Sequence, residues 1–192
     1  LGPDVAQDVA MTLPKSDRFG GGKIRLVESM QTASFDAETI ERFTATPFRR
    51  DARANRMGVR MDHDGDGFAT GAQLSIVSEV VVPGDIQISG DGAPYVLMYE
   101  CQTTGGYPRI GSVLPCDLPR VAQAQTGAAL TFEFVGMEEA VNLQARYIAA
   151  LNSLPSSVTP LVRDPAGMRD LLSYQMISGV VSAAANPFEE ES

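Results

Sequence analysis

Glycine, proline and aspartate break this chain into many short apolar runs, and that pattern limits its fold more than any other feature. The 192 residues include 18 glycines and 12 prolines. Runs rich in apolar, β-branched and aromatic residues that end at such turn residues predict strands. The predicted strands lie at residues 23–27, 48–50, 57–61, 73–77, 85–88, 95–101, 110–114 and 129–135. Many short strands with few helices predict a mainly β protein built as a closed or nearly closed β-barrel.

Signals for short helices lie between these strands. Asp36 is placed to cap a helix that runs to about Phe43. Asp117 is placed to cap a second helix through Gln123, with Pro119 tolerated in its first turn.

The pattern changes after the last strand to a helical extension. A helix is predicted from Met137 to about Leu151, and Asp164 begins another. Apolar residues of this second helix recur at helical spacing, and we expect that stripe to pack against the barrel. A docking surface for a companion subunit is the alternative. Residues 188–192 form an acidic end that we expect to be disordered.

Charge and composition exclude several classes of function. The net charge of −9 argues against nucleic acid, because phosphate binding needs clustered Lys and Arg. No apolar run is long enough to cross a membrane. The two cysteines, Cys101 and Cys116, are not closely paired, which is typical of a reduced, cytoplasmic protein. Each cysteine is expected to be a small buried apolar residue, although Cys101 is close enough to the candidate site to line it.

Residues 102–109 form the candidate ligand site. They follow an apolar run and combine groups suited to binding: Gln102, Thr103, Thr104, Gly105, Gly106, Tyr107 and Arg109. The two glycines allow positive φ angles and a close approach of a ligand. The hydroxyls, the guanidinium and freed backbone amides suit a carboxylate, a carbonyl or a phosphate. The alternative is an ordinary Gly-Gly turn between two strands.

This block stands with other motifs that resemble a known family. The matching residues are Asn55-Arg56-Met57-Gly58, Ser78-Glu79, Gly84 with Ile86-Gln87, Gln102 to Pro108, and Asp117 to Arg120. They resemble the carboxyltransferase-like family that includes the C-type component of bacterial ATP-dependent 5-oxoprolinase, allophanate hydrolase subunit 2 and the carboxyltransferase domain of urea carboxylase. The resemblance implies a cyclophilin-like β-barrel with short helices and a C-terminal helical tail.

The resemblance also implies a division of the chain. Members usually carry two similar lobes, and this chain corresponds to the second lobe. We therefore expect residues 1–22 to be a linker from a missing N-terminal lobe, 23–136 the barrel lobe, and 137–192 the C-terminal helical extension. The chain departs from the family at Arg109, where lysine is common, and at Val80, where glycine is common.

Roles for single residues follow from the same resemblance. The implied substrate-binding residues are Asn55, Arg56, Met57, Gly58, Gln87, Gln102, Thr103, Thr104, Gly105 and Gly106. The implied catalytic residues are Glu79, Tyr107 and Arg109. The guanidinium groups of Arg56 and Arg109 would clamp an anion. For Glu79 the alternative is a carboxylate that stabilises a turn or an ion pair.

The sequence leaves three functions open. The first is a component of an ATP-dependent 5-oxoprolinase, which hydrolyses 5-oxoproline to glutamate with B-type and A-type companion subunits. The chain itself is expected to bind no cofactor, since nothing in it resembles an ATP-binding loop, and ATP would be bound elsewhere in the complex. The second is biotin-dependent carboxyl transfer to urea or a related amide. The third is a regulatory module that pairs with the companion subunit.

No metal site is expected. His63 is the only histidine, so a three-histidine zinc site cannot form. Asp62, Asp64 and Asp66 resemble the first half of a calcium loop, but Gln73 stands where the loop needs a bidentate glutamate. We expect a solvated hairpin tip, with a bound calcium ion as the alternative.

Overall fold

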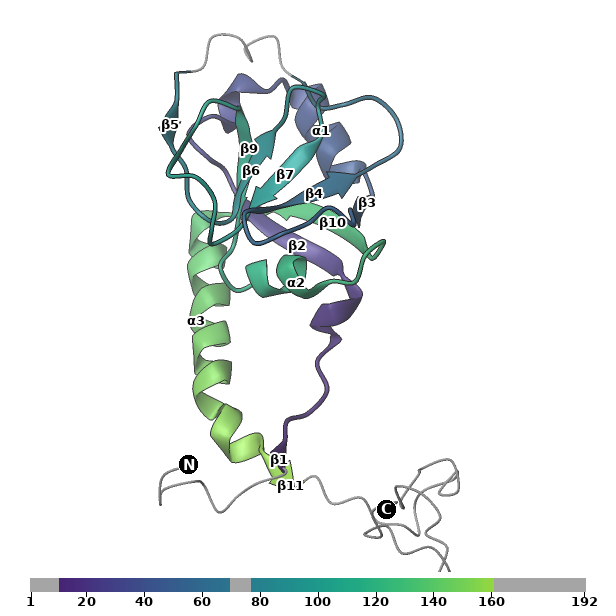
Figure 1. The fold of residues 1–192 in the computed structure, drawn as a ribbon. Coiled ribbons are helices and arrows are strands. Elements are labelled where there is room, and N and C mark those ends of the chain that lie inside the picture. Colours follow the sequence, from purple (N-terminus) through teal and green to yellow (C-terminus); the bar gives the residue numbers. More distant parts are fainter. Residues whose placement is uncertain (1–10, 70–76, 161–192) are drawn as a thin grey trace, which may run out of the picture. The chain divides into compact units, whose positions relative to one another are not determined.

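The computed structural model describes residues 11–69 and 77–160 (Figure 1). The described residues divide into two units, residues 14–157 and residues 11–13 with 158–160. In the smaller unit, β1 (Met11–Thr12) pairs antiparallel with β11 (Thr159–Pro160). The barrel and the helices around it belong to the larger unit.

Seven strands of the larger unit form a closed barrel (Figure 1). They are β2 (Gly22–Val27), β3 (Phe48–Arg50), β4 (Gly58–Asp62), β6 (Asp85–Ile88), β7 (Pro94–Leu97), β9 (Arg109–Val113) and β10 (Ala129–Phe134). Their order is β10-β2-β9-β6-β7-β4-β3, and antiparallel pairing of β3 with β10 closes the circle. Only β2 and β10 pair in parallel among these strands. The predicted mainly β barrel is confirmed.

Successive side chains along the strands alternate between the inner face of the barrel and its outer face. Ile86 and Ile88 of β6 and Val96 of β7 are fully buried in the core. Because successive side chains of a strand point to opposite faces, Gln87 on β6 and Tyr95 and Leu97 on β7 point to the outer face. The candidate site is built on this outer face.

Four phenylalanines anchor the core where the first helix meets the barrel. Helix α1 (Ala37–Ala45) begins as predicted at Asp36, whose side chain accepts from the Thr39 backbone N–H at 2.7 Å. The ring of Phe43 on α1 stacks on Phe132 of β10, with ring centroids 5.1 Å apart. Phe48 and Phe68 complete the cluster. Burial of a large aromatic side chain contributes roughly 1.5–3 kcal/mol, so this cluster fixes α1 on the barrel.

A two-stranded ribbon lies outside the barrel and was not expected. Its strands are β5 (Glu79–Val80) and β8 (Thr104–Gly105), which pair antiparallel with Glu79 opposite Gly105. We call it the β5–β8 ribbon. The predicted Gly-Gly loop is therefore partly a strand, and Gly105 and Gly106 are absent from the glycines with positive φ. Gly105 is in an extended strand paired with β5, so the positive φ that these glycines allow is not used.

Two other details differ from the sequence-based expectations. Strand β7 ends at Leu97, and Tyr99 and Glu100 form an exposed turn instead of continuing it. Helix α2 (Leu118–Gln123) begins after Asp117, but the Asp117 side chain makes no capping hydrogen bond. Its carboxylate instead accepts from Arg25, with 2.7 Å to the Arg25 Nε. The Arg25 guanidinium offers this carboxylate an opposite charge and two donors, whereas the start of a helix offers only backbone N–H groups.

Helix α3 (Met137–Ser153) follows β10 and is two residues longer than predicted. Ala140 is buried near its start, whereas most of its remaining side chains are exposed. Short 3₁₀ turns complete the unit: η1 (Asp17–Gly20), η2 (Thr32–Ser34) and η3 (Leu154–Ser157). In the described part of the chain, no helix combines the length and the apolar character needed to cross a membrane. The helix predicted from Asp164, the acidic end and most of the strand predicted at 73–77 lie outside the described residues.

Candidate functional site

A cavity of about 370 Å³ lies on the outer face of the barrel, against the β5–β8 ribbon. Its floor is formed by outward-pointing residues of β6 and β7, and its wall by β8 and the segment around it. Eight of the residues predicted from the sequence line it: Asn55, Met57, Gln87, Gln102, Thr104, Gly105, Gly106 and Tyr107. Segments from three separate parts of the sequence are thus brought together at one cavity.

Carboxamides and hydroxyls dominate the polar lining of the cavity. Asn55, Gln87 and Gln102 contribute amides, and Thr104 and Tyr107 contribute hydroxyls. Among the described residues that line it, none carries a formal charge. Such a lining suits a neutral group with both donors and acceptors, because an unpaired ion would lose its hydration there without gaining a counter-charge.

Gln87 lines this cavity, and its side-chain amide carries a buried donor. Its Nε2 is shielded from solvent and has no hydrogen-bond partner among the described residues. A buried donor without a partner destabilises the folded state by about 1–3 kcal/mol. A ligand acceptor bound to this N–H would remove that cost. Gly105 makes room for this amide, since a Cβ at that position would lie 2.3 Å from the Gln87 Nε2.

Asn55 also lines the cavity, and its side chain is held by its own turn. Its Oδ1 accepts from the backbone N–H groups of Met57 and Gly58, at 2.8 and 3.3 Å. The Nδ2 is therefore the part of this amide left for a ligand. Gly58 does not line the cavity, but a Cβ there would lie 2.7 Å from the Tyr95 ring. Glycine at this position lets the Tyr95 ring reach the cavity floor.

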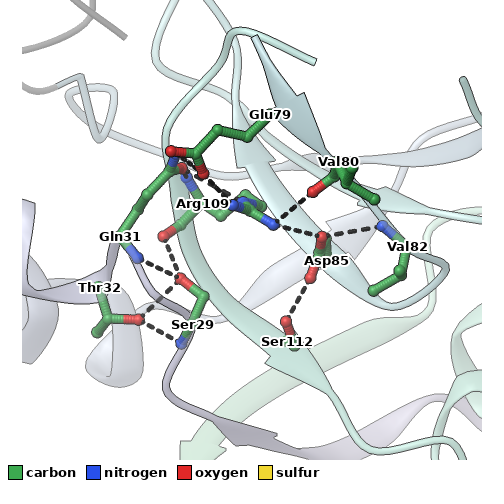
Figure 2. Close-up of polar contacts among 9 residues, drawn as sticks. All are labelled: Ser29, Gln31, Thr32, Glu79, Val80, Val82, Asp85, Arg109 and Ser112. Carbon is green, nitrogen blue, oxygen red and sulfur yellow. Dashed lines mark hydrogen bonds and ion pairs between the residues drawn. The ribbon is translucent and has the colours of Figure 1, made fainter. Parts of the chain in front are cut away.

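Arg109 does not line the cavity but lies beside it in a dense polar network (Figure 2). Its Nη2 donates to Glu79 Oε2 at 2.7 Å, and its Nη1 donates to the Val80 carbonyl at 3.0 Å and to Asp85 Oδ2 at 3.2 Å. Gln31 Oε1 accepts from the Arg109 backbone N–H at 2.9 Å. The side chain is 10% exposed, so the guanidinium is largely removed from solvent.

Three other predicted residues also lie outside the cavity lining. Glu79 is bound by Arg109 and by Gln31 Nε2, which donates to its carboxylate at 3.0 Å. The Arg56 side chain is 84% exposed and pairs with Glu100 at 3.2 Å. Thr103 contributes its carbonyl, which accepts from the Val81 backbone N–H at 3.1 Å. These contacts leave Glu79 in the ion-paired state that was the alternative interpretation.

Five residues line the cavity that had not been assigned to it as binding residues: Val81, Ser89, Tyr95, Leu97 and Cys101. Strand alternation could have found Ser89, Tyr95 and Leu97, because they share the outer face with Gln87. No sequence signal marks Val81. Cys101 is half-buried, and burial raises the pKa of its thiol above the usual value. A thiol of this kind is mainly protonated at neutral pH and is a weak nucleophile.

The acidic hairpin tip forms no cation site in the described part of the chain. Asp64 is bound in a two-pronged ion pair by Arg49, with distances of 2.8 and 3.0 Å. No group of three or more acidic, cysteine or histidine side chains suited to a metal occurs among the described residues. Gln73, the remaining position of the calcium pattern, lies outside them.

Comparison with known proteins gives consistent matches. Residues 3–134 match the family model described as carboxyltransferase domain, subdomain A and B. The C-type component of 5-oxoprolinase from Escherichia coli (strain K12) is 32% identical over 134 residues, which cover 68% of this chain and 43% of that protein. Its counterpart from Haemophilus influenzae is 30% identical over 123 residues, covering 64% and 39%. The chain therefore spans about two fifths of the length of these relatives.

Similarity in three dimensions extends further than similarity in sequence. The solved structure of Kluyveromyces lactis urea carboxylase superimposes with a TM-score of 0.59 over 79% of this chain and 15% of that one, at 20% identity. At this identity the match supports the fold alone. It agrees with the closed barrel described above.

Proposed function

Because the chain belongs to the carboxyltransferase domain family, subdomains A and B, we propose that its cavity binds a small amide or lactam substrate as part of a 5-oxoprolinase complex. The observation that carries the proposal is the neutral, amide-rich cavity with an unpartnered Gln87 donor. The curated relatives at about 30% identity both bear the name of the C-type component of 5-oxoprolinase.

The polar and apolar groups of a lactam ring complement the groups that line the cavity. Its carbonyl oxygen accepts from the Gln87 Nε2, and its N–H is a donor for the carboxamide oxygen of Gln102 or the hydroxyl of Thr104. Aliphatic ring carbons pack on Met57, Val81 and Leu97, which supply the apolar surface of the cavity. As the carbonyl gains negative charge during hydrolysis, a fixed amide donor becomes more valuable. Tyr107 adds a hydroxyl at the exposed side of the cavity.

The substrate carboxylate then lies outside the neutral part of the cavity. Arg56 directly follows Asn55 and is exposed, and its pair with Glu100 is of the weak surface kind. It is available to exchange Glu100 for a substrate carboxylate. We assign ATP to companion subunits, because a triphosphate needs cations that the described lining of this cavity lacks.

The other two functions considered from the sequence have less support. Carboxyl transfer would rest on the urea carboxylase likeness, and at 20% identity that likeness supports the fold alone. A purely regulatory module would not require a buried unpartnered donor at the floor of a cavity. Both remain outcomes of the experiment that follows.

The test is ATP-dependent release of glutamate from 5-oxoproline by the protein combined with its companion subunits. Thr104→Val removes a cavity hydroxyl from β8 and is expected to lower kcat/KM at least tenfold. Thr131→Val is the matched control, because Thr131 is also exposed on a strand, on β10, and lies outside the cavity lining. Normal release with Thr104→Val and with Gln87→Met would overturn the assignment of the cavity. Failure of the wild-type mixture to release glutamate while the subunits still associate would overturn the reaction itself and favour a regulatory module.

A further inference from the structure

Four residues connect the barrel strands β6 and β9 with the β5–β8 ribbon, each contacting the next. Arg109 on β9 is ion-paired with Glu79 on β5. Glu79 stands opposite Gly105 of β8 in the ribbon. Gly105 lies against the amide of Gln87 on β6, and Gln87 is in turn the partner of Arg109 in the β6–β9 ladder. The ribbon is therefore linked to β9 through Glu79 and lies against β6 at Gly105.

The side-chain contacts that tie β5 to the barrel meet at one guanidinium (Figure 2). Arg109 binds the Glu79 carboxylate and the Val80 carbonyl, which are the two residues of β5. Gln31 strengthens the tie, because its Oε1 accepts from Arg109 while its Nε2 donates to Glu79. Asp85 completes the network by accepting from Arg109 and from the Val82 backbone N–H at 3.1 Å.

We propose that Arg109, Glu79 and Gln31 form a clasp that positions the β5–β8 ribbon as the movable wall of the ligand cavity. In this assignment Glu79 and Arg109 are positioning residues, and neither touches the ligand. The functional meaning of the clasp rests on the proposed role of the cavity, but its mechanical part can be tested alone.

The geometry explains why such a clasp is needed. A ribbon of two residues in each strand is too short to hold its own position, since isolated two-stranded hairpins are marginal in water. The ion pair with Arg109, which is itself buried, supplies the missing restraint. Because Glu79 is itself half exposed, solvent can compete for its carboxylate, and the clasp can open without unfolding the barrel. Opening would separate Gly105 from Gln87 and widen the cavity.

The two cysteines allow this motion to be measured. Cys101 lines the cavity, whereas Cys116 lies in a different pocket beside Arg25 and α3. Both are half-buried, and burial raises the pKa of each thiol. The rate of alkylation by iodoacetamide, followed for each cysteine by mass spectrometry, reports local opening at Cys101 with Cys116 as the internal reference.

Glu79→Gln is the variant that opens the clasp. It removes the charge that binds Arg109 and leaves the side chain nearly unchanged in size. Glu133→Gln is a matched control, because Glu133 on β10 is also 48% exposed and is ion-paired with Lys23 at 3.0 Å. We expect Glu79→Gln to raise the alkylation rate of Cys101 about tenfold and to leave that of Cys116 unchanged. A tenfold change is the size expected when a hydrogen bond between charged groups is lost. Arg109→Lys should act in the same direction, since lysine cannot reproduce the fork of contacts.

A pH series separates opening from a change in thiol ionisation. Opening raises the limiting rate at high pH, whereas an altered pKa shifts only the midpoint of the profile. A Cys101 rate in Glu79→Gln equal to that of the wild type, or an equal rise at Cys101 and Cys116, would overturn the clasp. Either result leaves the glutamate-release test unaffected, so the two proposals fail separately.

Discussion

Gln87 and Arg109 are partners across the β6–β9 ladder, yet their side chains have opposite hydrogen-bonding states. The Arg109 guanidinium is bound to Glu79, Val80, Asp85 and Gln31. The Gln87 Nε2 is buried and unpartnered among the described residues. In our proposals, Arg109 holds the wall of the cavity and Gln87 binds the ligand. The contrast in hydrogen bonding between the two side chains is what separates these two roles.

Replacing Gln87 should therefore affect function and stability in opposite directions. Gln87→Met keeps the length of the side chain and removes the unpartnered amide. We expect the free energy of unfolding to be unchanged or up to about 1 kcal/mol higher, because the desolvation penalty disappears. Urea denaturation measures this, with the exposed Gln123→Met on α2 as the control. A loss of more than about 1 kcal/mol would show that the amide has a structural partner.

Gly105→Ala should disturb the site without unfolding the barrel. The new Cβ would meet the Gln87 Nε2 at 2.3 Å and the Val81 Cγ1 at 3.3 Å, so the flexible amide must move away. We expect glutamate release to fall at least tenfold while the melting temperature changes by less than about 3 °C. Gly90→Ala is the control, because no atom lies within 4 Å of the added Cβ there. Equal activity in the two variants would contradict the close approach at Gly105.

The buried carboxylate of Asp117 should contribute more to stability than an exposed one. Asp117 is 6% exposed in its side chain and accepts from the Arg25 backbone N–H and guanidinium, which joins α2 to β2. We expect Asp117→Ala to lower the free energy of unfolding by about 2–3 kcal/mol, because hydrogen bonds to charged groups are lost and Arg25 is left unpaired.

Asp64→Ala is the comparison for this effect. Asp64 pairs with Arg49 through a side chain that is 88% exposed, and solvent screens such pairs so that they add little to stability. We therefore expect a clearly smaller loss than for Asp117→Ala. Denaturant unfolding of both variants gives the two values. Similar losses would mean that burial does not distinguish the two ion pairs.

Asp91 should make stability depend on pH in the acid range. A hydrogen bond from Ser89, together with Arg60, lowers the pKa of its carboxyl from 3.8 to about 2. A depressed pKa in the folded state contributes stability above the unfolded pKa, and that contribution is lost as pH falls from about 3.8 to about 2. The melting temperature of the wild type should therefore exceed that of Asp91→Asn at neutral pH, and the difference should vanish near pH 2. A constant difference over this range would exclude Asp91 as the source.

Local patterns predicted most of the barrel. The runs around Ile24, Ile86 and Phe132 carry strong strand signals, and Asp36 caps α1 as its position indicates. Such patterns depend on neighbours in the sequence, so they can be recognised without the fold. Asp117 shows the limit, because the residue next to α2 was recognised but its partner Arg25 was not.

The sequence alone determined that this chain forms a β-barrel, and it predicted a ligand site at residues 102–107. Tertiary structure decided which of these residues reach the cavity. Arg109 was expected to clamp an anion, but its partners Asp85, Glu79 and Gln31 lie 24, 30 and 78 residues away in the chain. No local pattern encodes contacts at such separations. Pairing of β6 with β9 brings Asp85 within reach of the guanidinium, and the β5–β8 ribbon outside the barrel brings Glu79. The charge of these two carboxylates then holds Arg109 beside the cavity instead of in it.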